Sequence, residues 1–384
     1  MRVAMICTEK LPVPPVRGGA IQTYIAGVLG HLSAAHNITV IGTTDPRLPA
    51  DERVGRVRYV RFDGQGVFET YAQQVIQFLR ANAFDIIHVF NRPRFVPMIR
   101  EVCPKARIIL SMHNDMFDIS KIGRQEAEAA ISQVERIITI SDYVGRVIAS
   151  LYPQAAGKLR TIYSGVDLQR FVPWEVPPQG RQIRQELRNK HQLNGKQVIL
   201  FVGRLTPKKG ADILVRAMNE LSRQHSNIAL VLVGGSWYGE DRVSDYVAYI
   251  RSLAARSPVP VVTTGYVPAE QIHHWFWAGD VFVCPSQWEE PLARVHYEAM
   301  AAGLPFVTTK RGGNAEVVIN GNGLLVEQPE DPAALARQLH TLLSNRDLQR
   351  RMGRMGRKLA EERFGWERVA REIRAVWENT GQRR

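Results

Sequence analysis

The chain has 384 residues, a length that exceeds one ordinary hydrophobic core and suits two domains of about 100–200 residues each. Its composition of 45% hydrophobic and 23% charged residues is typical of a folded globular protein and excludes disorder of the whole chain. The apolar runs fall far short of the ~20 residues that span a bilayer, and residues 1–8 enter a strand pattern without a signal-peptide segment. We therefore expect a cytoplasmic protein that is neither membrane-spanning nor secreted.

The charge is strongly basic, because 50 Lys and Arg residues outnumber 37 Asp and Glu residues and give a net charge of +13. A basic surface favours anionic partners, which include nucleotides, phosphorylated polymers, nucleic acid and acidic lipid. The basic residues form no run with interleaved aromatic residues, so we expect no nucleic-acid partner, whereas peripheral contact with other anionic surfaces stays open. Three cysteines without a Cys-x-x-Cys pair predict neither a disulfide framework nor a zinc site.

The first half of the chain alternates short apolar runs with longer segments of helical period, a pattern typical of a parallel sheet with crossover helices. The predicted strands are Val3–Cys7, Thr39–Ile41, Ile86–Phe90, Ile108–Met112, Ile137–Ile140 and Thr161–Tyr163. Between the first two strands, Ile21, Ile25, Val28, Leu29 and Leu32 recur at intervals of three and four, which predicts a helix.

The pattern breaks between Gly165 and Gly195, where three prolines and a polar, basic stretch predict a linker into the next domain. A second series of strands follows at Val198–Val202, Leu230–Val233, Val261–Thr263, Val281–Cys284, Phe306–Thr308 and Leu324–Val326. Helices are predicted around 211–224, 241–256, 268–277 and 294–302, and from Pro332 to about Thr380. The fold class is therefore α/β, with two doubly wound domains at residues 1–180 and 181–363.

Ligands of open parallel sheets bind beyond the carboxyl ends of the strands, so the residues that follow each strand are the first candidates for a site. Gly18 and Gly19 precede the first helix, where backbone N–H groups can approach an anion, although a glycine pair also suits an ordinary tight turn. His113 directly follows a strand and could donate to a substrate hydroxyl, or could be a satisfied polar group without a ligand.

In the second half, Arg204 and Lys209 lie between a strand and a helix that a glycine opens. A guanidinium fork and an ammonium point charge at such a place suit a diphosphate, although charged loop residues can also simply face water. Glu290 lies in the loop after the strand Val281–Cys284, and Glu298 lies eight residues later inside the next predicted helix. Carboxylates so placed can accept hydrogen bonds from sugar or ribose hydroxyls.

The string from Cys284 to Pro305, with its Glu-x7-Glu spacing, resembles the retaining glycosyltransferases of family 4, which have the GT-B fold. Further matches are Gly-Gly-Ala at 18–20, Ile140-Ser141, Gly165-Val166-Asp167 with Phe171, the Gly203–Gly210 loop, Gly312-Gly313-Asn314 with Glu316, and Phe364-Gly365-Trp366. The resemblance covers essentially the whole chain, and 285–288 and 293–297 are similar to spore-coat glycosyltransferases of endospore-forming bacteria. It implies two Rossmann-like domains facing a cleft, with a C-terminal helix at 364–384 that crosses back to the first domain.

The resemblance also implies roles for individual residues. Arg204 and Lys209 would hold the diphosphate of a nucleotide-sugar, Glu290 the donor sugar and Glu298 the ribose, while His113 would lie in the cleft. The implied catalytic residues are His113, Arg204, Lys209 and Glu290. The implied donor-binding residues are Gly18, Gly19, Gly203, Tyr266, Val267, Leu292, Ala293, Arg294 and Glu298.

The implied activity is transfer of a sugar from a nucleoside-diphosphate sugar, UDP before GDP, with retention of configuration. The acceptor would be a glycan, a lipid-linked or a small molecule, with glycans of the cell envelope and of the spore coat as candidates. No Asp-x-Asp motif occurs in the chain, so we expect the cations to replace a metal ion and we expect no cofactor.

Two departures from the family pattern leave an alternative open. Ile21-Gln22 stands where an acidic residue is common, and Pro291-Leu292-Ala293 stands where Gly-Phe-Gly is usual. The extra Cβ of Ala293 lies where backbone amides should approach the ligand. A catalytically weak coat or nucleotide-sugar-binding protein is therefore the alternative, whereas a phosphorylase or epimerase would share the cations but not the full Glu-x7-Glu string.

Overall fold

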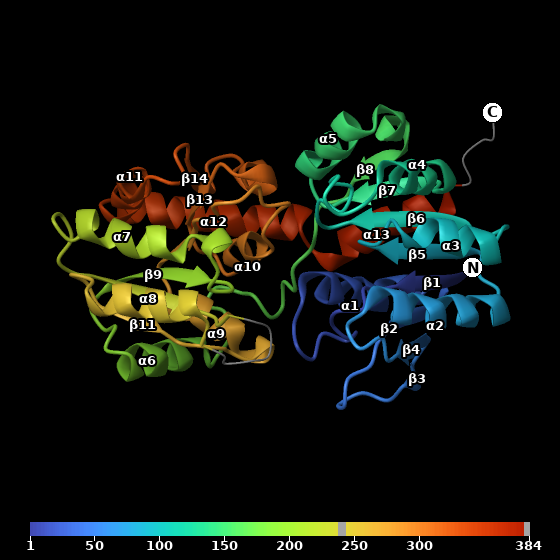
Figure 1. The fold of residues 1–384 in the computed structure, drawn as a ribbon. Helices are drawn as coiled ribbons and strands as arrows, with labels where there is room; N and C mark the ends of the chain where they lie inside the picture. Colours follow the sequence, from blue (N-terminus) through green and yellow to red (C-terminus); the bar gives the residue numbers. More distant parts are fainter. Residues whose placement is uncertain (237–242, 380–384) are drawn as a thin grey trace. The chain divides into compact units, whose positions relative to one another are not determined.

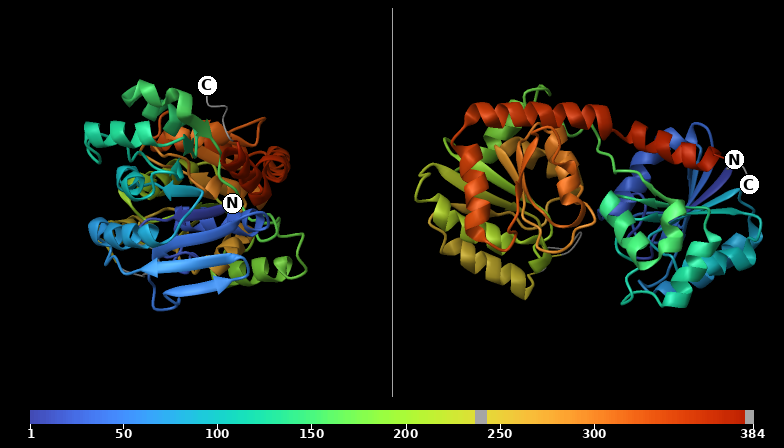
Figure 2. Two further views of the ribbon diagram at one scale, coloured as in Figure 1. Left: turned by 90° about the vertical axis from the view of Figure 1, so that its right-hand side faces the viewer. Right: turned by 90° about the horizontal axis from the view of Figure 1, so that it is seen from above.

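The computed structural model describes residues 1–236 and 243–379, and the chain divides into two compact units (Figure 1). The N-terminal unit combines Met1–Gly165 with the chain from Trp366 onward, and the C-terminal unit is Val166–Gly365. Each unit is built around its own sheet with helices on both faces (Figure 2). Within the described ranges, no helix is both long enough and apolar enough to cross a bilayer.

The sheet of the N-terminal unit has the strand order β3-β4-β2-β1-β5-β6-β7-β8, and all neighbours are parallel except the antiparallel pair β3 and β4. Its strands are β1 (Arg2–Ile6), β2 (Asn37–Thr43), β3 (Asp51–Val54), β4 (Val57–Phe62), β5 (Ile86–Phe90), β6 (Arg107–Met112), β7 (Arg136–Thr139) and β8 (Leu159–Thr161). Its helices are α1 (Ala20–Ser33), α2 (Phe68–Ala81), α3 (Phe95–Val102), α4 (Arg124–Gln133), α5 (Asp142–Leu151) and α13 (Trp366–Glu378).

Strand β1 shows why both faces of this sheet are covered. Successive side chains of a strand point to opposite faces, so Val3 and Met5 pack with α1 and α13, whereas Ala4 and Ile6 pack with α2 and α3. All four side chains are completely buried. The continuous apolar strands of the sequence are therefore those of a sheet buried on both faces.

The sheet of the C-terminal unit is wholly parallel, in the order β11-β10-β9-β12-β13-β14. Its strands are β9 (Gln197–Val202), β10 (Ile228–Val233), β11 (Val261–Thr263), β12 (Val281–Cys284), β13 (Phe306–Thr309) and β14 (Gly323–Val326). Its helices are α6 (Gly180–Lys190), α7 (Ala211–Leu221), α8 (Asp245–Ala255), α9 (Ile272–Ala278), α10 (Val295–Ala301), α11 (Pro332–Leu343) and α12 (Arg346–Arg363). Short 3-10 turns include η2 (Pro207–Lys209) and η4 (Gly312–Val317).

The first boundary lies between Gly165 and Val166, fifteen residues before the predicted division at 180 and 181. The predicted linker is in part a helix, because α6 lies within it and packs on α9. Arg184 and Arg188 of α6 bind the carboxylate of Asp280 at 2.6 and 3.1 Å. These ion pairs attach the segment to the C-terminal unit, and the linker prediction is wrong at that point.

The chain returns to the N-terminal unit between Gly365 and Trp366. The N–H of Val166 donates to the carbonyl of Phe364 at 2.8 Å, so the two crossing segments are paired at the edge of the C-terminal unit. Beyond them, α13 packs on α1, and the ring of Trp366 lies 5.9 Å from that of Tyr24 in an edge-on arrangement. This confirms the predicted C-terminal helix that crosses back to the first domain.

Candidate functional site

The loops after β9 and β12 meet at the carboxyl edge of the C-terminal sheet. Gly210 makes this contact possible, because its φ is +69° and a Cβ there would lie 2.0 Å from the carbonyl oxygen of Pro285. The N–H of Gln287 donates to the carbonyl of Lys208 at 2.8 Å, which joins the two loops directly. Lys209, at the end of η2, is thereby held beside the loop that contains Glu290.

The carboxylate of Glu290 is the centre of this arrangement. Lys209 Nζ, Trp288 Nε1 and Ser286 Oγ all donate to its Oε2 atom, at 2.6, 2.7 and 3.0 Å. Glu290 is only 6% exposed. Within residues 1–236 and 243–379 all three donors share Oε2, which leaves Oε1 available to a ligand hydroxyl.

Burial and charge shift the pKa of Glu290 in opposite directions. Burial alone would raise the pKa of this carboxyl, but the charge of Lys209 and the three hydrogen bonds outweigh it and hold the pKa below its usual value. Lys208 and Lys209 also lie near the Trp288 ring, with Nζ 4.7 and 6.0 Å from its centroid. The site therefore holds a buried, ionised carboxylate next to cations.

The backbone of Glu290 is fixed from the other side by η4. The N–H of Gly313 donates to the Glu290 carbonyl at 2.7 Å, and the N–H of Gly312 donates to the Glu289 carboxylate at 2.6 Å. Gly312 has a φ of +54°, and a Cβ there would lie 2.0 Å from the Glu290 carbonyl oxygen. A larger residue at 312 would displace Glu290, which explains the glycine pair of the sequence motif.

The segment that follows Glu290 is tied down by buried polar side chains. The N–H of Ala293 donates to Asn314 Oδ1 at 3.1 Å, so this backbone amide already has a partner. The ring of His296, fully buried, contacts the Ala293 carbonyl at 2.8 Å and Thr308 Oγ1 at 2.9 Å. Leu292 and Ala293 are themselves buried. The predicted donor-binding segment is thus held at Ala293 by hydrogen bonds on both its N–H and its carbonyl.

Glu298 occupies α10, where Arg294 Nη2 donates to its Oε1 atom at 3.3 Å. The Glu298 side chain is 14% exposed. Burial raises the pKa of Glu298, against the opposing charges of Arg294 and Arg170. The two predicted carboxylates thus differ in environment, since the pKa of Glu290 is lowered and that of Glu298 is raised.

Three glycines bring the ends of β9, β10 and β11 together. The N–H of Gly203 donates to the carbonyl of Val233, and a Cβ at Gly234 would lie 2.0 Å from the Gly203 carbonyl oxygen. Gly234 and Gly265 form a bridge. The predicted residues Arg204, Tyr266 and Val267 follow these glycines and are half-buried.

The remaining predicted residues belong to the N-terminal unit. Gly18 and Gly19 precede α1, and the amide of Gln22 in its first turn donates to the Leu11 carbonyl at 3.1 Å. His113 follows β6 and is 7% exposed, and its N–H donates to Asn91 Oδ1 at 3.0 Å. These residues lie at the carboxyl edge of their sheet, as predicted.

The structure therefore brings together Lys209 with Glu290 and Arg294 with Glu298. The sequence analysis missed Ser286, Trp288 and Asn314 as site residues. Ser286 and Trp288 stand four and two positions before Glu290, and both of them and Asn314 belong to motifs that were recognised. Hydrogen-bonding side chains so close in sequence to a predicted site carboxylate are the signal that could have identified Ser286 and Trp288.

Comparison with known proteins identifies the family of the chain. The family model described as "Glycosyltransferase Family 4" matches residues 18–170, and the model described as "Glycosyl transferases group 1" matches residues 183–359. The chain is 42% identical over 380 residues to "Spore coat protein SA" of Bacillus subtilis, covering 98% of this chain and 99% of that protein.

More distant proteins share the fold. The chain is 27% identical to a "GDP-mannose-dependent alpha-(1-6)-phosphatidylinositol monomannoside mannosyltransferase" of Mycolicibacterium smegmatis, covering 92% of this chain and 93% of that protein. It is similar to the crystal structure of Anabaena HepE with UDP and glucose, with a TM-score of 0.75 at 20% identity and coverage of 98% and 99%. Sucrose-phosphate synthase of Thermosynechococcus elongatus gives a TM-score of 0.79 at 22% identity, with 98% of both chains covered. The chain therefore belongs to the glycosyltransferases of family 4 and has the GT-B fold.

Proposed function

We propose that the protein transfers a sugar from a nucleoside-diphosphate sugar to an acceptor hydroxyl, with retention at the anomeric carbon and without a metal ion. The observation that supports this most strongly is the ion pair of Lys209 with the buried carboxylate of Glu290, at the carboxyl edge of a parallel sheet. The pair combines a cation for phosphate with an acceptor for sugar hydroxyls. Ligands of such folds bind at this edge.

The cations act on the leaving group. As the bond between the anomeric carbon and the phosphate oxygen breaks, negative charge grows on the diphosphate, and Arg204 and Lys209 stabilise it. The ammonium group of Lys209 has three N–H donors, of which one is directed to Glu290. The acceptor oxygen forms the new bond on the same face of the sugar, and its proton passes to the departing phosphate, so charge and protons balance.

The two carboxylates hold different parts of the donor in this proposal. Glu290 Oε1 accepts a hydrogen bond from a hydroxyl of the transferred sugar, while Glu298 accepts from the ribose. Glu298→Ala should then weaken both the free nucleoside diphosphate and the intact donor, and Glu290→Ala should weaken mainly the intact donor. Calorimetric titration of both ligands tests this, and equal losses of nucleoside diphosphate affinity in the two variants would contradict the division.

The base of the donor is proposed as uracil. HepE was solved with UDP and glucose, whereas the mycobacterial relative is described as GDP-mannose-dependent, so relatives differ in the base that they use. A glycan of the cell envelope or spore coat is proposed as the acceptor, on the 42% identity to a protein named for the spore coat.

The test is a donor panel with a product assay. UDP, GDP and ADP are first compared for the rise in melting temperature that a ligand of the folded state produces. The matching sugar nucleotides are then incubated with and without excess EDTA, and the anomeric configuration of the released or transferred sugar is read by NMR. Retained configuration and EDTA resistance support the proposal, and abolition by EDTA with rescue by Mg²⁺ or Mn²⁺ contradicts the metal-independent part.

One observation favours a second candidate, a coat protein that binds the nucleotide-sugar but turns it over weakly. The amide of Ala293 is already bonded to Asn314, and the methyl group of Ala293 is buried beside it. Ala293→Gly removes this methyl group. Faster donor hydrolysis by Ala293→Gly than by the natural protein, at equal donor affinity, would support the weak enzyme, whereas unchanged hydrolysis supports the first proposal.

A further inference from the structure

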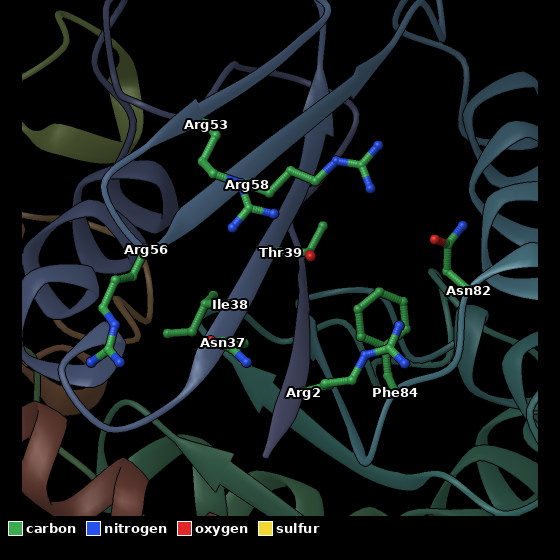
Figure 3. A pocket seen from close by; sticks show the side chains of 9 residues that line it. All are labelled: Arg2, Asn37, Ile38, Thr39, Arg53, Arg56, Arg58, Asn82 and Phe84. Carbon is green, nitrogen blue, oxygen red and sulfur yellow. The ribbon is translucent and has the colours of Figure 1, made fainter.

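A basic hollow lies on the N-terminal unit, at the amino ends of β1, β2 and β4 (Figure 3). Its volume is about 250 Å³, and it opens where α2 ends at Ala81 and no longer covers the sheet. Four arginines line it and none of its lining residues is acidic. These arginines are Arg2, Arg53, Arg56 and Arg58.

The register of the sheet places like charges side by side. Arg53 of β3 is the direct antiparallel partner of Arg58 of β4, and Arg58 is in turn aligned with Thr39 of β2. Neighbouring strands lie about 4.8 Å apart, so the three side chains form one row across the sheet. Figure 3 shows Arg53 and Arg58 on neighbouring strands beside Thr39. Like charges directly opposite each other destabilise a strand pair.

The protein itself neutralises only part of this charge. Arg58 binds Asp51 through two hydrogen bonds of 3.1 and 2.6 Å, and Arg56 donates to the carbonyl of Ala34 at 2.7 Å. Arg53 makes no hydrogen bond or ion pair with any residue in the ranges 1–236 and 243–379. The charge of Arg53 also acts on the Asp51 carboxylate, whose pKa Arg58 and Arg53 both lower, so this one carboxylate balances only part of the charge of the four arginines.

Aromatic and amide groups complete the lining. The guanidinium of Arg2 lies over the ring of Phe84, 5.8 Å from its centroid, and this arrangement is visible in Figure 3. Stacking of this kind holds a guanidinium in place while its N–H donors remain available in the ring-parallel plane. Asn37 and Asn82 add amide groups to the rim.

We propose that this hollow binds a multiply charged phosphate group, such as a diphosphate or a phosphate monoester. Guanidinium groups offer planar pairs of donors that match phosphate oxygens. A volume of about 250 Å³ equals roughly eight water molecules at ~30 Å³ each, which accommodates a diphosphate. Such an anion also relieves the repulsion between Arg53 and Arg58.

This site is separate from the proposed donor chemistry. The hollow is at the amino ends of the strands, whereas Gly19 and His113 lie at the carboxyl edge of the same sheet. An anion bound in the hollow is away from the proposed site of sugar transfer. Its role is therefore to tether the protein to a phosphate-bearing partner or to regulate it. The proposal concerns the N-terminal unit alone and stands whether or not the proposed transfer is correct.

The test is calorimetric titration with inorganic pyrophosphate, in protein that carries Arg204→Gln and Lys209→Gln so that the other cationic site is removed. Arg53→Gln with Arg56→Gln removes two cations from the hollow, and affinity should fall at least about tenfold, because hydrogen bonds to charged groups each contribute more than a neutral one. The control, Arg124→Gln with Arg160→Gln, removes the same charge from exposed positions of the same unit and should change little.

A second variant separates binding from folding. Arg53→Glu places an acidic group opposite Arg58, so it should raise the melting temperature without ligand and abolish the further rise that pyrophosphate produces. A parallel sedimentation assay with phosphatidic acid vesicles, whose headgroup is a phosphate monoester, tells whether a lipid headgroup or a free phosphate supplies the anion, and loss of either interaction in Arg53→Gln, Arg56→Gln protein supports the site. Equal pyrophosphate and vesicle binding by the hollow and control variants would overturn the proposal.

Discussion

Glu290 is a carboxylate that is buried and nevertheless ionised, and its neighbours explain how. A charge removed from water is unfavourable unless it is paired and hydrogen-bonded. Lys209, Ser286 and Trp288 supply one cation and three donors to a single oxygen atom. The arrangement is costly to disturb, so Lys209 has both a structural and a functional role.

Lys209→Ala should therefore lower turnover by roughly 10²–10³, because it removes a group that stabilises charge on the leaving phosphate. It should also reduce the free energy of unfolding by about 1–3 kcal/mol, because Glu290 stays buried without its cation. The neighbouring Lys208→Ala is the matched control, since Lys208 is exposed and its ammonium group lies over the face of Trp288 and not on Glu290. Steady-state kinetics and urea unfolding measure both effects. Equal turnover in the two variants would remove Lys209 from the mechanism.

The acid stability of the protein should reveal the opposite environments of Glu290 and Glu298. The folded pKa of Glu290 is lowered from 4.5, so its stabilising contribution is present above that value and is lost as the pH falls through the folded pKa. The folded pKa of Glu298 is raised from 4.5, so its contribution is full below that value and is lost as the pH rises through the folded pKa.

Urea unfolding between about pH 7 and pH 3 tests these signs. Glu290→Gln should flatten the loss of stability on acidification, and Glu298→Gln should make it steeper, because each substitution removes one of two opposing contributions. Lys358→Gln, at an exposed position of α12, is a charge control. Parallel pH profiles for the two glutamine variants would show that the environments do not differ as described.

The sequence predicted Lys209 and Glu290 as site residues because both lie in loops that follow strands of a parallel sheet, and their role in binding a ligand stays a prediction. It could not predict that they bind each other, since the two are separated by 81 positions and meet only through Gly210 and its close approach to Pro285. The sequence also could not predict the hydrogen bond of the Ala293 amide, because this bond depends on where Asn314 of η4 lies.

At the scale of elements, two glycines of α1 illustrate how tightly α13 is packed. A Cβ at Gly27 would lie 2.3 Å from Trp366, whereas a Cβ at Gly30 would have nothing within 4 Å. The ring of Trp366 therefore occupies the space that a side chain at position 27 would need.

Gly27→Ala should lower the free energy of unfolding by about 1–3 kcal/mol, because it overpacks the contact between α1 and α13. Gly30→Ala should instead raise it by about 0.5–1 kcal/mol, since it improves helix propensity without a clash. The two substitutions are chemically identical and lie in one helix, so each controls for the other. Chemical denaturation followed by tryptophan fluorescence measures both, and a destabilising Gly30→Ala would contradict the explanation.

The strands with continuous buried apolar runs were predicted, whereas β3, β4 and α6, which charged residues help to hold, were not. All four residues of β3 are polar, charged or exposed, and β4 carries Arg58 and Arg61. Arg61 is nevertheless buried, because it donates to the carbonyl of Val13 at 2.9 Å. Likewise α6 is fixed by arginines on Asp280 rather than by an apolar face. Hydrophobic periodicity carries no signal for such elements.

At the scale of the whole molecule, the alternation of strands and helices predicted two doubly wound units. The boundary was predicted less well, because prolines and polar residues mark irregular backbone rather than the point where packing changes. Packing changes at Gly165, which lies against the ring of Trp366, so a Cβ there would come within 2.5 Å of that ring. The contact joins residues that are 201 positions apart, and composition along the chain cannot show it.

The position of Lys209 and Glu290 in the C-terminal unit predicts which segments of the chain a nucleotide will contact. A ligand that binds only the folded state slows local opening of the segments that it contacts, and hydrogen exchange measures this opening segment by segment. UDP should therefore slow amide exchange in residues 203–210 and 285–298 of the C-terminal unit, and leave β1 to β5 of the N-terminal unit unchanged. Lys209→Ala should remove this protection, and Lys208→Ala should keep it. Slower exchange at Gly18 and Gly19 as well would add the predicted glycine loop to the nucleotide site. Protection confined to the N-terminal unit would show that the donor site lies elsewhere than at Lys209 and Glu290.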